Sequence, residues 1–343
     1  MSGDSTVIKR QDGKGAAIVT TLRNAGQTID SFVDYHLAIG FAHLYLFFDD
    51  PNDPDFARFR ANPFVTAIAH DAKLRELWTA LPQYSAQAEF LDTEVMARQV
   101  LNAEFAMRLA REQGFGWLLH IDADELFYSP NEPAGEHFAS LERQGLEAIN
   151  YPNYEAVPER DAIGDVFREV NLFKVPSPLC RLPITEAGVR LAQTTPQLLP
   201  NFFHFYSSGK SAVRLSAAGM RPEGVHTFLR PDGKFNAGQS MRHFVLHYPC
   251  CGFDAFWTKY VTLGKFPDQW WQKYDIAGVS PLHLEARDVV ATGDRDAALA
   301  FYRQRIAMQD RERVANLLAF GILERFTQPQ EVLRGVAKSR LPD

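Results

Sequence analysis

Cysteine is scarce in this sequence, with three in 343 residues, two of them adjacent at Cys250 and Cys251. A disulfide framework needs several spaced cysteine pairs, so the sequence does not fit the class of small, disulfide-stabilised secreted domains. The first residues, MSGDSTVIKRQDGKG, also lack the apolar stretch of a secretory signal peptide. We therefore expect a protein of a reducing compartment, the cytoplasm.

Long apolar runs and an excess of positive charge are absent as well. No run of about 18 apolar residues occurs, so we expect no transmembrane segment, while peripheral contact with a membrane stays an open alternative. The net charge is −6, which leaves no basic excess to neutralise phosphates, and we expect no nucleic-acid partner. The remaining balance, 46% hydrophobic and 23% charged residues, is typical of a globular protein with a sizeable core.

The stretch GFGWLLHIDADELFY, residues 114–128, combines an apolar strand with a group of acids. Trp117–Ile121 has the pattern of a strand buried on both faces of a parallel sheet. It runs into Asp122 and Asp124, which lie on the same side of an extended chain and can bind one divalent cation together. Carboxylates at the end of a buried strand also require positive compensation. The alternative interpretation is a solvated acidic loop.

The residues before this stretch have the pattern of a doubly wound α/β unit. We expect strands at Ala16–Leu22, His43–Phe48 and Phe64–Ala69, and helices from Thr28 to Gly40 and from Asp92 to Gly114. The connections should be right-handed crossovers. Arg98, Gln99 and Asn102 form a polar cluster on the second helix, which is either a functional patch or an ordinary solvated face.

After Tyr128 the expected strands are shorter, and the C-terminal part is helical. We expect strands at Phe167–Val175, Phe202–Tyr206 and Phe244–Tyr248, and helices at Ala298–Met308 and Arg311–Phe326. We divide the chain into a frayed segment 1–15, an α/β half 16–130, a mixed half 131–253 and a helical region 254–343. Because no linker separates the two halves, we expect them to share one continuous sheet.

Several familiar motifs are incomplete. Gly209-Lys210-Ser211 lacks the first glycine of a phosphate-binding loop, since His204 stands at that position. No GxSxG sequence occurs, and the residues after Asp124 do not fit a DxDxT/V phosphatase. His243 and His247 are four residues apart on an expected strand, so both face one way. Each is either a hydrogen-bonded histidine or a metal ligand.

The opening segment and the acidic stretch together resemble a known family, the GT-A glycosyltransferases of the family 2 and family 92 type. The matching positions of the opening segment are Arg23-Asn24, Tyr35-His36, Gly40 and Asp49. WLLHIDADELF is similar to the family's metal-binding DxDE segment, and Gln99 and Asn102 match the helix before it. Weaker matches, within a resemblance covering residues 16–265, are GKSAVR (209–214), Val225-His226-Thr227, Leu246-His247-Tyr248 and Phe253–Lys259. Ala25 departs from the family, which has an acidic residue there.

The resemblance implies a GT-A fold, a Rossmann-like mixed sheet with flanking helices, with the nucleotide-sugar bound by the half 16–130 and the acceptor by the half 131–253. It implies transfer of a sugar, with inversion, from a nucleotide-sugar, UDP-linked, to a glycan or glycolipid acceptor. A Mn²⁺ or Mg²⁺ ion would stabilise the leaving diphosphate, bound by Asp122 and Asp124. His247 is the third ligand by this resemblance, and His226 is its rival.

Further roles follow from the same resemblance. Donor contacts are expected from Thr20, Thr21, Arg23, Asp49 or Asp50, and Arg98, at the switch-point crevice of the sheet. The base that accepts the acceptor's proton is expected at Glu155, with Glu186 as the second choice. The alternative for Glu155 is a solvated loop acid. Because of Ala25 and the uncertain base, the alternative function is a catalytically silent glycan- or nucleotide-binding relative.

Overall fold

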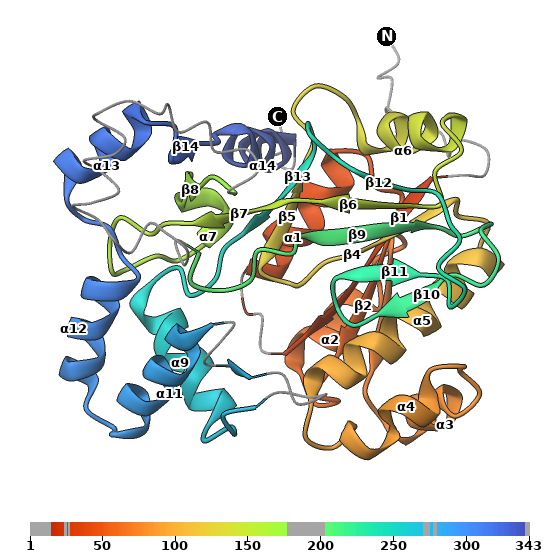
Figure 1. Cartoon of the computed structure of the whole chain (residues 1–343), viewed down its shortest axis with the longest axis horizontal. Coiled ribbons are helices and arrows are strands. Elements are labelled where there is room, and N and C mark those ends of the chain that lie inside the picture. Colours follow the sequence, from red (N-terminus) through yellow and green to blue (C-terminus); the bar gives the residue numbers. More distant parts are fainter. Residues whose placement is uncertain are drawn as a thin grey trace, which may run out of the picture.

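The fold is known from a computed structural model that describes residues 15–23, 26, 28–176, 203–269, 275–276 and 280–339. The described residues form two larger β-sheets and a separate two-stranded sheet, with helices around them (Figure 1). The larger sheet has seven strands in the order β12-β6-β9-β4-β1-β2-β3, and the smaller has five in the order β14-β8-β7-β13-β5.

The parallel part of the larger sheet comes from the expected α/β half. Its strands are β1 (Ala16–Leu22), β2 (His43–Phe48), β3 (Val65–Ala69) and β4 (Trp117–His120). β1 pairs in parallel with β2 on one side and with β4 on the other. All residues of β1, β2 and β4 are buried, as the continuous apolar runs predict for strands covered on both faces.

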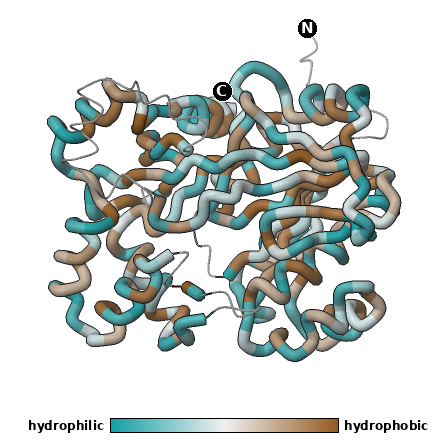
Figure 2. Tube along the Cα trace, in the orientation of Figure 1, coloured by the Kyte–Doolittle hydropathy of each residue, from teal (hydrophilic) through white to brown (hydrophobic). Residues whose placement is uncertain are grey.

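Helices cover both faces of this sheet because alternate strand residues point to opposite sides. Ile18 and Leu44 pack with α1 (Thr28–Ala38) in one core cluster. Val19 and Tyr45 pack with α5 (Val95–Glu112) in another. In Figure 2, brown hydrophobic stretches follow the central strands, and teal stretches follow the outer loops. The smaller helices here are α2 (Pro54–Phe59), α3 (Ala72–Trp78), α4 (Tyr84–Gln87) and the 3-10 helix η1 (Ala88–Phe90).

The larger sheet continues with strands from the second half of the chain. β9 (Lys210–Arg214) lies antiparallel between β4 and β6 (Ala148–Tyr151), and β12 (Ala237–Gln239) pairs with β6. Gly209 leads into β9 with a φ of +71°, and a Cβ there would lie 2.3 Å from the carbonyl oxygen of Tyr151. Only glycine allows that approach. The two halves therefore share one sheet.

The smaller sheet begins directly after the acidic stretch, with β5 (Glu125–Tyr128). Its other strands are β7 (Asn153–Ala156), β8 (Leu172–Lys174), β13 (Phe244–His247) and β14 (Leu323–Arg325). β13 pairs antiparallel with β5 and in parallel with β7. The helices of this part of the chain are α6 (Ala134–Arg143) and α7 (Val166–Glu169). The strands β10 (Arg221–Glu223) and β11 (Thr227–Leu229) pair antiparallel as the separate two-stranded sheet.

Three expected elements differ from the structure. The strand expected at 167–175 is the short helix α7 followed by β8, because Asp165 caps the helix by accepting the Phe167 N–H at 3.1 Å. Residues 203–206 form no strand, and Phe202 lies outside the described residues. The helix expected to reach Phe326 ends at Ala319, since Gly321 turns the chain with a φ of +67° into β14.

Helices form the C-terminal region, with a small core of their own. They are α9 (Phe253–Leu263), α11 (Pro281–Ala291), α12 (Arg295–Arg305), α13 (Arg311–Ala319) and α14 (Gln328–Ser339). α14 returns to pack on α1 (Figure 1). The prediction of a Rossmann-like mixed α/β sheet with flanking helices and a helical C-terminal region is confirmed. Among the described helices, none has the length and apolar character needed to cross a membrane.

Candidate functional site

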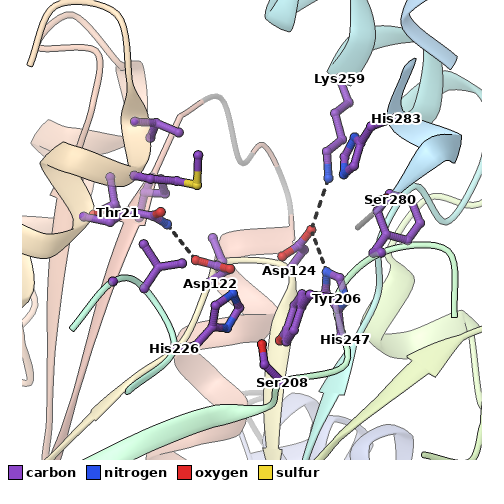
Figure 3. A pocket seen from close by; sticks show the side chains of 18 of the residues that line it. Thr21, Asp122, Asp124, Tyr206, Ser208, His226, His247, Lys259, Ser280 and His283 are labelled. Carbon is purple, nitrogen blue, oxygen red and sulfur yellow. Dashed lines mark hydrogen bonds and ion pairs between the residues drawn. The ribbon is translucent and has the colours of Figure 1, made fainter. Parts of the chain in front are cut away.

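A cavity of about 870 Å³ opens at the carboxyl ends of β1 and β4 and extends to the C-terminal helices α9 and α11 (Figure 3). In the sheet, β2 and β3 follow β1 on one side, whereas β4, the next strand in the sequence, lies on the other side of β1, so the strand order reverses there. Ligands of open α/β sheets bind at such a reversal of strand order. The cavity is lined by Thr21, Leu22, Arg23, Thr28, Val95, Met96, Gln99, Asp122, Ala123, Asp124, Phe205, Tyr206, Ser207, Ser208, Glu223, Gly224, Val225, His226, Thr227, His247, Lys259, Ser280 and His283.

The Asp122 carboxylate is held by two side chains. Gln99 donates to its Oδ1 at 2.7 Å, and the Lys210 ammonium donates to its Oδ2 at 2.6 Å. The backbone N–H of Asp122 donates to Glu125 Oε2 at 2.7 Å. Burial alone would raise the pKa of Asp122, but Lys210, together with His120 and His226, outweighs burial and holds that pKa below its usual range. Asp122 is therefore an ionised, fixed acceptor in the cavity.

Lys210 is completely buried, with none of its side chain exposed. Burial would lower its pKa, but Asp122 and then Glu125, 3.8 Å away, raise the pKa instead. The pKa of Glu125 lies well above its usual range, because burial outweighs the attraction of Lys210. Lys210 therefore lies between an ionised aspartate and a glutamate whose charged form burial disfavours.

Asp124 faces a histidine and a lysine from other parts of the chain. Its Oδ2 lies 3.8 Å from His247 Nε2 and 3.9 Å from Lys259 Nζ (Figure 3). His247 reaches this position because it pairs with Glu125 across the β5–β13 ladder. Burial lowers the pKa of His247 to about 3, so the ring is neutral and offers a lone pair. Asp124 keeps 39% of its side chain exposed, toward the cavity.

His226 enters the cavity from the turn between β10 and β11. Its Nδ1 lies 2.9 Å from the carbonyl oxygen of Gly209, which assigns the proton to Nδ1 and leaves Nε2 as an acceptor. Burial lowers the pKa of His226 to about 4. The Tyr206 ring lies 4.5 Å from the His226 ring and 4.7 Å from the His247 ring, centroid to centroid. Tyr206 thus separates the two histidines.

The structure brings six of the expected site residues to the cavity and places others elsewhere. The six are Thr21, Arg23, Asp122, Asp124, His226 and His247. Asp49 and Arg98 do not line it. They bind each other, with Nε–Oδ1 2.6 Å and Nη2–Oδ2 2.8 Å apart. Thr20 is buried within β1, and Asp50 accepts the Asn52 N–H at 2.9 Å in the following loop.

The Glu155 carboxylate, expected as the base, is enclosed by donors and is absent from the cavity lining. Lys174 Nζ lies 2.5 Å from Oε1, and the backbone N–H groups of His204 and Phe205 donate to the carboxylate at 2.9 Å. Only 1% of Glu155 is exposed. These contacts fix the segment that carries Phe205 into the cavity. Glu186 lies outside the described residues.

Residue patterns alone did not identify several groups of the site. Lys259, Phe205, Tyr206 and His283, which line the cavity, and Lys210, which is buried beside Asp122, were not predicted as site residues. The requirement that buried carboxylates have positive compensation is a signal for Lys210 and Lys259. No local sequence pattern pointed to Phe205 and Tyr206, because they belong to a segment without regular secondary structure.

Comparison with known proteins gives two clear similarities. No protein-family model matches the chain. Glycosyltransferase-like At2g41451 of Arabidopsis thaliana is 28% identical over 349 residues, covering 96% of this chain and 74% of that protein. Glycosyltransferase-like At3g57200, also of Arabidopsis thaliana, is 27% identical over 341 residues, covering 94% of this chain and 64% of that protein.

Likeness to solved structures is slight. Core-mannan synthase A of Aspergillus fumigatus, in its Mn/GDP form, gives a TM-score of 0.28 at 10% identity, covering 56% of this chain and 51% of that one. Glucosyl-3-phosphoglycerate synthase of Mycobacterium tuberculosis, in complex with phosphoglyceric acid, gives 0.28 at 15% identity, covering 59% and 57%. Such values do not establish a shared fold, so the fold assignment rests on the sheet order described above.

Proposed function

We propose that this protein is a GT-A glycosyltransferase that moves a sugar from a UDP-linked donor to a glycan or glycolipid acceptor, with inversion and with the help of a divalent cation. The observation that carries the proposal is the convergence of Asp122, Asp124 and His247 in one cavity at the switch point of the sheet. The glycosyltransferase-like names of the two Arabidopsis proteins support it.

The groups beside Asp124 fit a cation of the Mn²⁺ type. Two ligands of one ion lie at most about 4.2 Å apart when each bond is about 2.1 Å. Asp124 Oδ2 and His247 Nε2 are 3.8 Å apart, and the imidazole is neutral. Imidazole with carboxylate suits Mn²⁺ better than Mg²⁺, which prefers oxygen alone. When bound, the cation would supply Lewis-acid stabilisation of the leaving diphosphate.

Lys259 and Lys210 would have different electrostatic roles in the site. Lys259 lines the cavity, with a third of its side chain exposed, and lies 3.9 Å from Asp124. We assign it a contact with the donor diphosphate, because it is the exposed ammonium beside the expected cation. Lys210 is too deeply buried for such a contact, and it fixes Asp122 instead. Thr21 and Arg23, at the end of β1, would bind the nucleoside part.

The base for an inverting reaction needs a free carboxylate near the acceptor. Glu155 is surrounded by donors, which favours a structural role for it, and Glu186 keeps its place as an alternative. Glu223, at the end of β10, is exposed and is the third carboxylate among the described cavity residues, after Asp122 and Asp124. We therefore place Glu223 first. Glu223→Gln should lower turnover about 100-fold or more while donor binding is kept.

Calorimetric titration with UDP, with and without Mn²⁺, tests the central proposal. Asp122→Asn and Asp124→Asn should each abolish the Mn²⁺-dependent part of UDP binding while circular dichroism stays unchanged. Asp232→Asn, an exposed aspartate in a turn outside the cavity lining, is the matched control and should bind like the wild type. Unchanged Mn²⁺-dependent affinity in both cavity variants would contradict the assignment.

A silent nucleotide-binding relative is the second candidate, because both oxygens of Asp122 already have partners and Glu155 is enclosed. Release of UDP from UDP-sugars without an acceptor distinguishes the two candidates. An active enzyme should release UDP slowly from at least one donor, and this release should disappear in Asp124→Asn. Mn²⁺-dependent UDP binding with no release from any UDP-sugar would favour the silent relative.

A further inference from the structure

A second group of metal-ligating side chains lies outside the cavity. Glu132 belongs to the link between β5 and α6, His137 to the first turns of α6, and His243 immediately precedes β13. One ligand atom from each of the three lies within 4.8 Å of the others. Glu132 Oε1 is 3.1 Å from His243 Nε2 and 3.7 Å from His137 Nδ1. Ligand atoms in a tetrahedral zinc site have comparable separations of about 3.3 Å.

We propose that Glu132, His137 and His243 bind a transition-metal cation such as Zn²⁺. Two imidazole nitrogens and one carboxylate form a ligand set that occurs at zinc sites with an open fourth position. This set differs from the oxygen-rich group at Asp122 and Asp124, so the two sites should differ in metal preference. The inference does not depend on the proposed transferase activity.

The second nitrogen of His137 is already oriented. His137 Nε2 lies 2.8 Å from the hydroxyl of Tyr151, a fully buried residue of β6. In metal sites such a partner fixes the ring and its tautomer and directs the other nitrogen toward the ion. Here that other nitrogen is Nδ1, the atom near Glu132. The backbone N–H of His243 donates to Ser240 Oγ at 2.9 Å, which fixes the start of β13.

The charges of the group favour a cation. One carboxylate oxygen and two imidazole nitrogens converge here, a mixed oxygen and nitrogen donor set that a transition-metal cation can join. Within the described part of the chain, the ion-pair contacts of Glu132 are with these two rings. The Glu132 carboxylate therefore faces imidazole rings rather than a lysine or arginine.

The position of the group separates it from the cavity. His243 immediately precedes β13 and His247 ends it, which places the two roughly 13 Å apart along an extended chain. The two histidine side chains are buried, whereas 35% of the Glu132 side chain is exposed. A cation can therefore enter past Glu132, and the exposed side would keep the fourth position open to water. The ring centroids of His137 and His243 lie 3.8 Å apart with their planes tilted by 30°, so both rings are adjacent to the Glu132 carboxylate.

Titration of the metal-free, full-length protein with Zn²⁺ alone, in competition with a chromophoric chelator, tests the inference. The wild type should bind one zinc ion tightly. Glu132→Gln and His243→Ala should bind it at least about 100-fold more weakly, and Tyr151→Phe about 10- to 100-fold more weakly. Glu136→Gln, which changes an exposed glutamate beside His137 on α6, is the matched control and should bind zinc like the wild type. Asp124→Asn should also keep this zinc ion.

Two further measurements make the result decisive. Circular dichroism of the zinc-free variants shows whether each one folds, and Glu132→Gln, in a partly exposed link, serves as the main variant if His243→Ala does not fold. Co²⁺ in place of Zn²⁺ should give visible bands without thiolate charge transfer, which excludes Cys250 and Cys251 as ligands. No zinc binding by the wild type, or equal affinity in Glu132→Gln and the wild type, would overturn the proposal.

Discussion

Lys210 determines the charge balance of the acidic stretch. It is fully buried, 2.6 Å from Asp122 Oδ2 and 3.8 Å from Glu125 Oε2. Removing one partner of such a buried pair leaves an uncompensated charge, which typically costs about 3–5 kcal/mol. Lys210 therefore lets the chain keep an ionised aspartate at the end of an otherwise apolar strand.

Lys210→Met should lower the free energy of unfolding by about 3–5 kcal/mol in urea titrations at pH 7, because Asp122 loses its ammonium partner. The double variant Lys210→Met/Asp122→Asn should recover part of the loss, since no charge is then left alone. Lys259→Met, which removes a partly exposed ammonium 3.9 Å from Asp124, is the control and should cost much less. Equal losses in both single variants would contradict this view of Lys210.

His247 and His226 are the two candidates for the third ligand of the proposed cation site, and their contacts differ. His247 Nε2 faces Asp124 at 3.8 Å, whereas His226 lies behind the Tyr206 ring and is held by Gly209. His247→Ala should therefore weaken Mn²⁺ binding more than His226→Ala does, as measured by the Mn²⁺ concentration needed for half-maximal UDP binding. The reverse order would move the ligand to His226.

Among the elements, β7 and β8 hold the segment that carries the aromatic rings of the cavity. Glu155 on β7 binds Lys174 on β8 and the backbone of His204 and Phe205. The Phe205 ring lies 5.2 Å from the His283 ring and 5.3 Å from Lys259 Nζ. Two short strands thus determine where one wall of the cavity stands.

Glu155→Gln should lower the free energy of unfolding by about 3 kcal/mol or more, because Lys174 loses the carboxylate that compensates its buried charge. Donor binding should weaken along with it, as Phe205 shifts. Thermal unfolding and UDP titration measure the two effects, and Glu155→Gln/Lys174→Met should regain stability. If stability and UDP binding stay unchanged while turnover falls about 100-fold, Glu155 is the base after all.

Local patterns predicted the parallel strands well and the long-range pairings poorly. The bounds of β1 and β2 agree with the sequence, because each is an apolar run between polar turns. The sequence predicted a strand where α7 forms, because Phe167 would be buried in a strand as well as in a helix. The Asp165 cap decides in favour of the helix. The acidic pair was predictable from its strand. Its partner Lys210 was not, because 88 residues separate it from Asp122.

At the scale of the whole molecule, buried neutral histidines couple folding to pH. His36, His120, His247 and His283 all have a pKa lowered to about 3 by burial. The unfolded chain, with an ordinary pKa near 6.5, binds more protons than the folded chain between about pH 3 and pH 6.5. The stabilisation from these rings is fully present above about pH 6.5 and is lost as the pH falls.

The urea midpoint of unfolding should be flat near pH 7 to 8 and fall steeply between pH 6.5 and 5. Each such histidine should lower the free energy of unfolding by about 1.4 kcal/mol for each unit that the pH falls in that range. His120→Gln should make the fall shallower by about one histidine, because its ring is one of the buried neutral groups. A midpoint that is constant from pH 7 to pH 5 would contradict this account.

The position of β9 also has a consequence for the order in which the nascent chain folds. β4 and β6 are synthesised before β9, the strand that lies between them in the sheet. Neither can complete its pairing until β9, which begins at Lys210, has left the ribosome. Until then the apolar edge of β4 is open to pairing with other chains. Stalled chains that end before Lys210 should therefore recruit chaperones and aggregate when released. Chains that extend past β13 should neither recruit chaperones nor aggregate. A sedimentation assay of the released chains would measure the difference in aggregation.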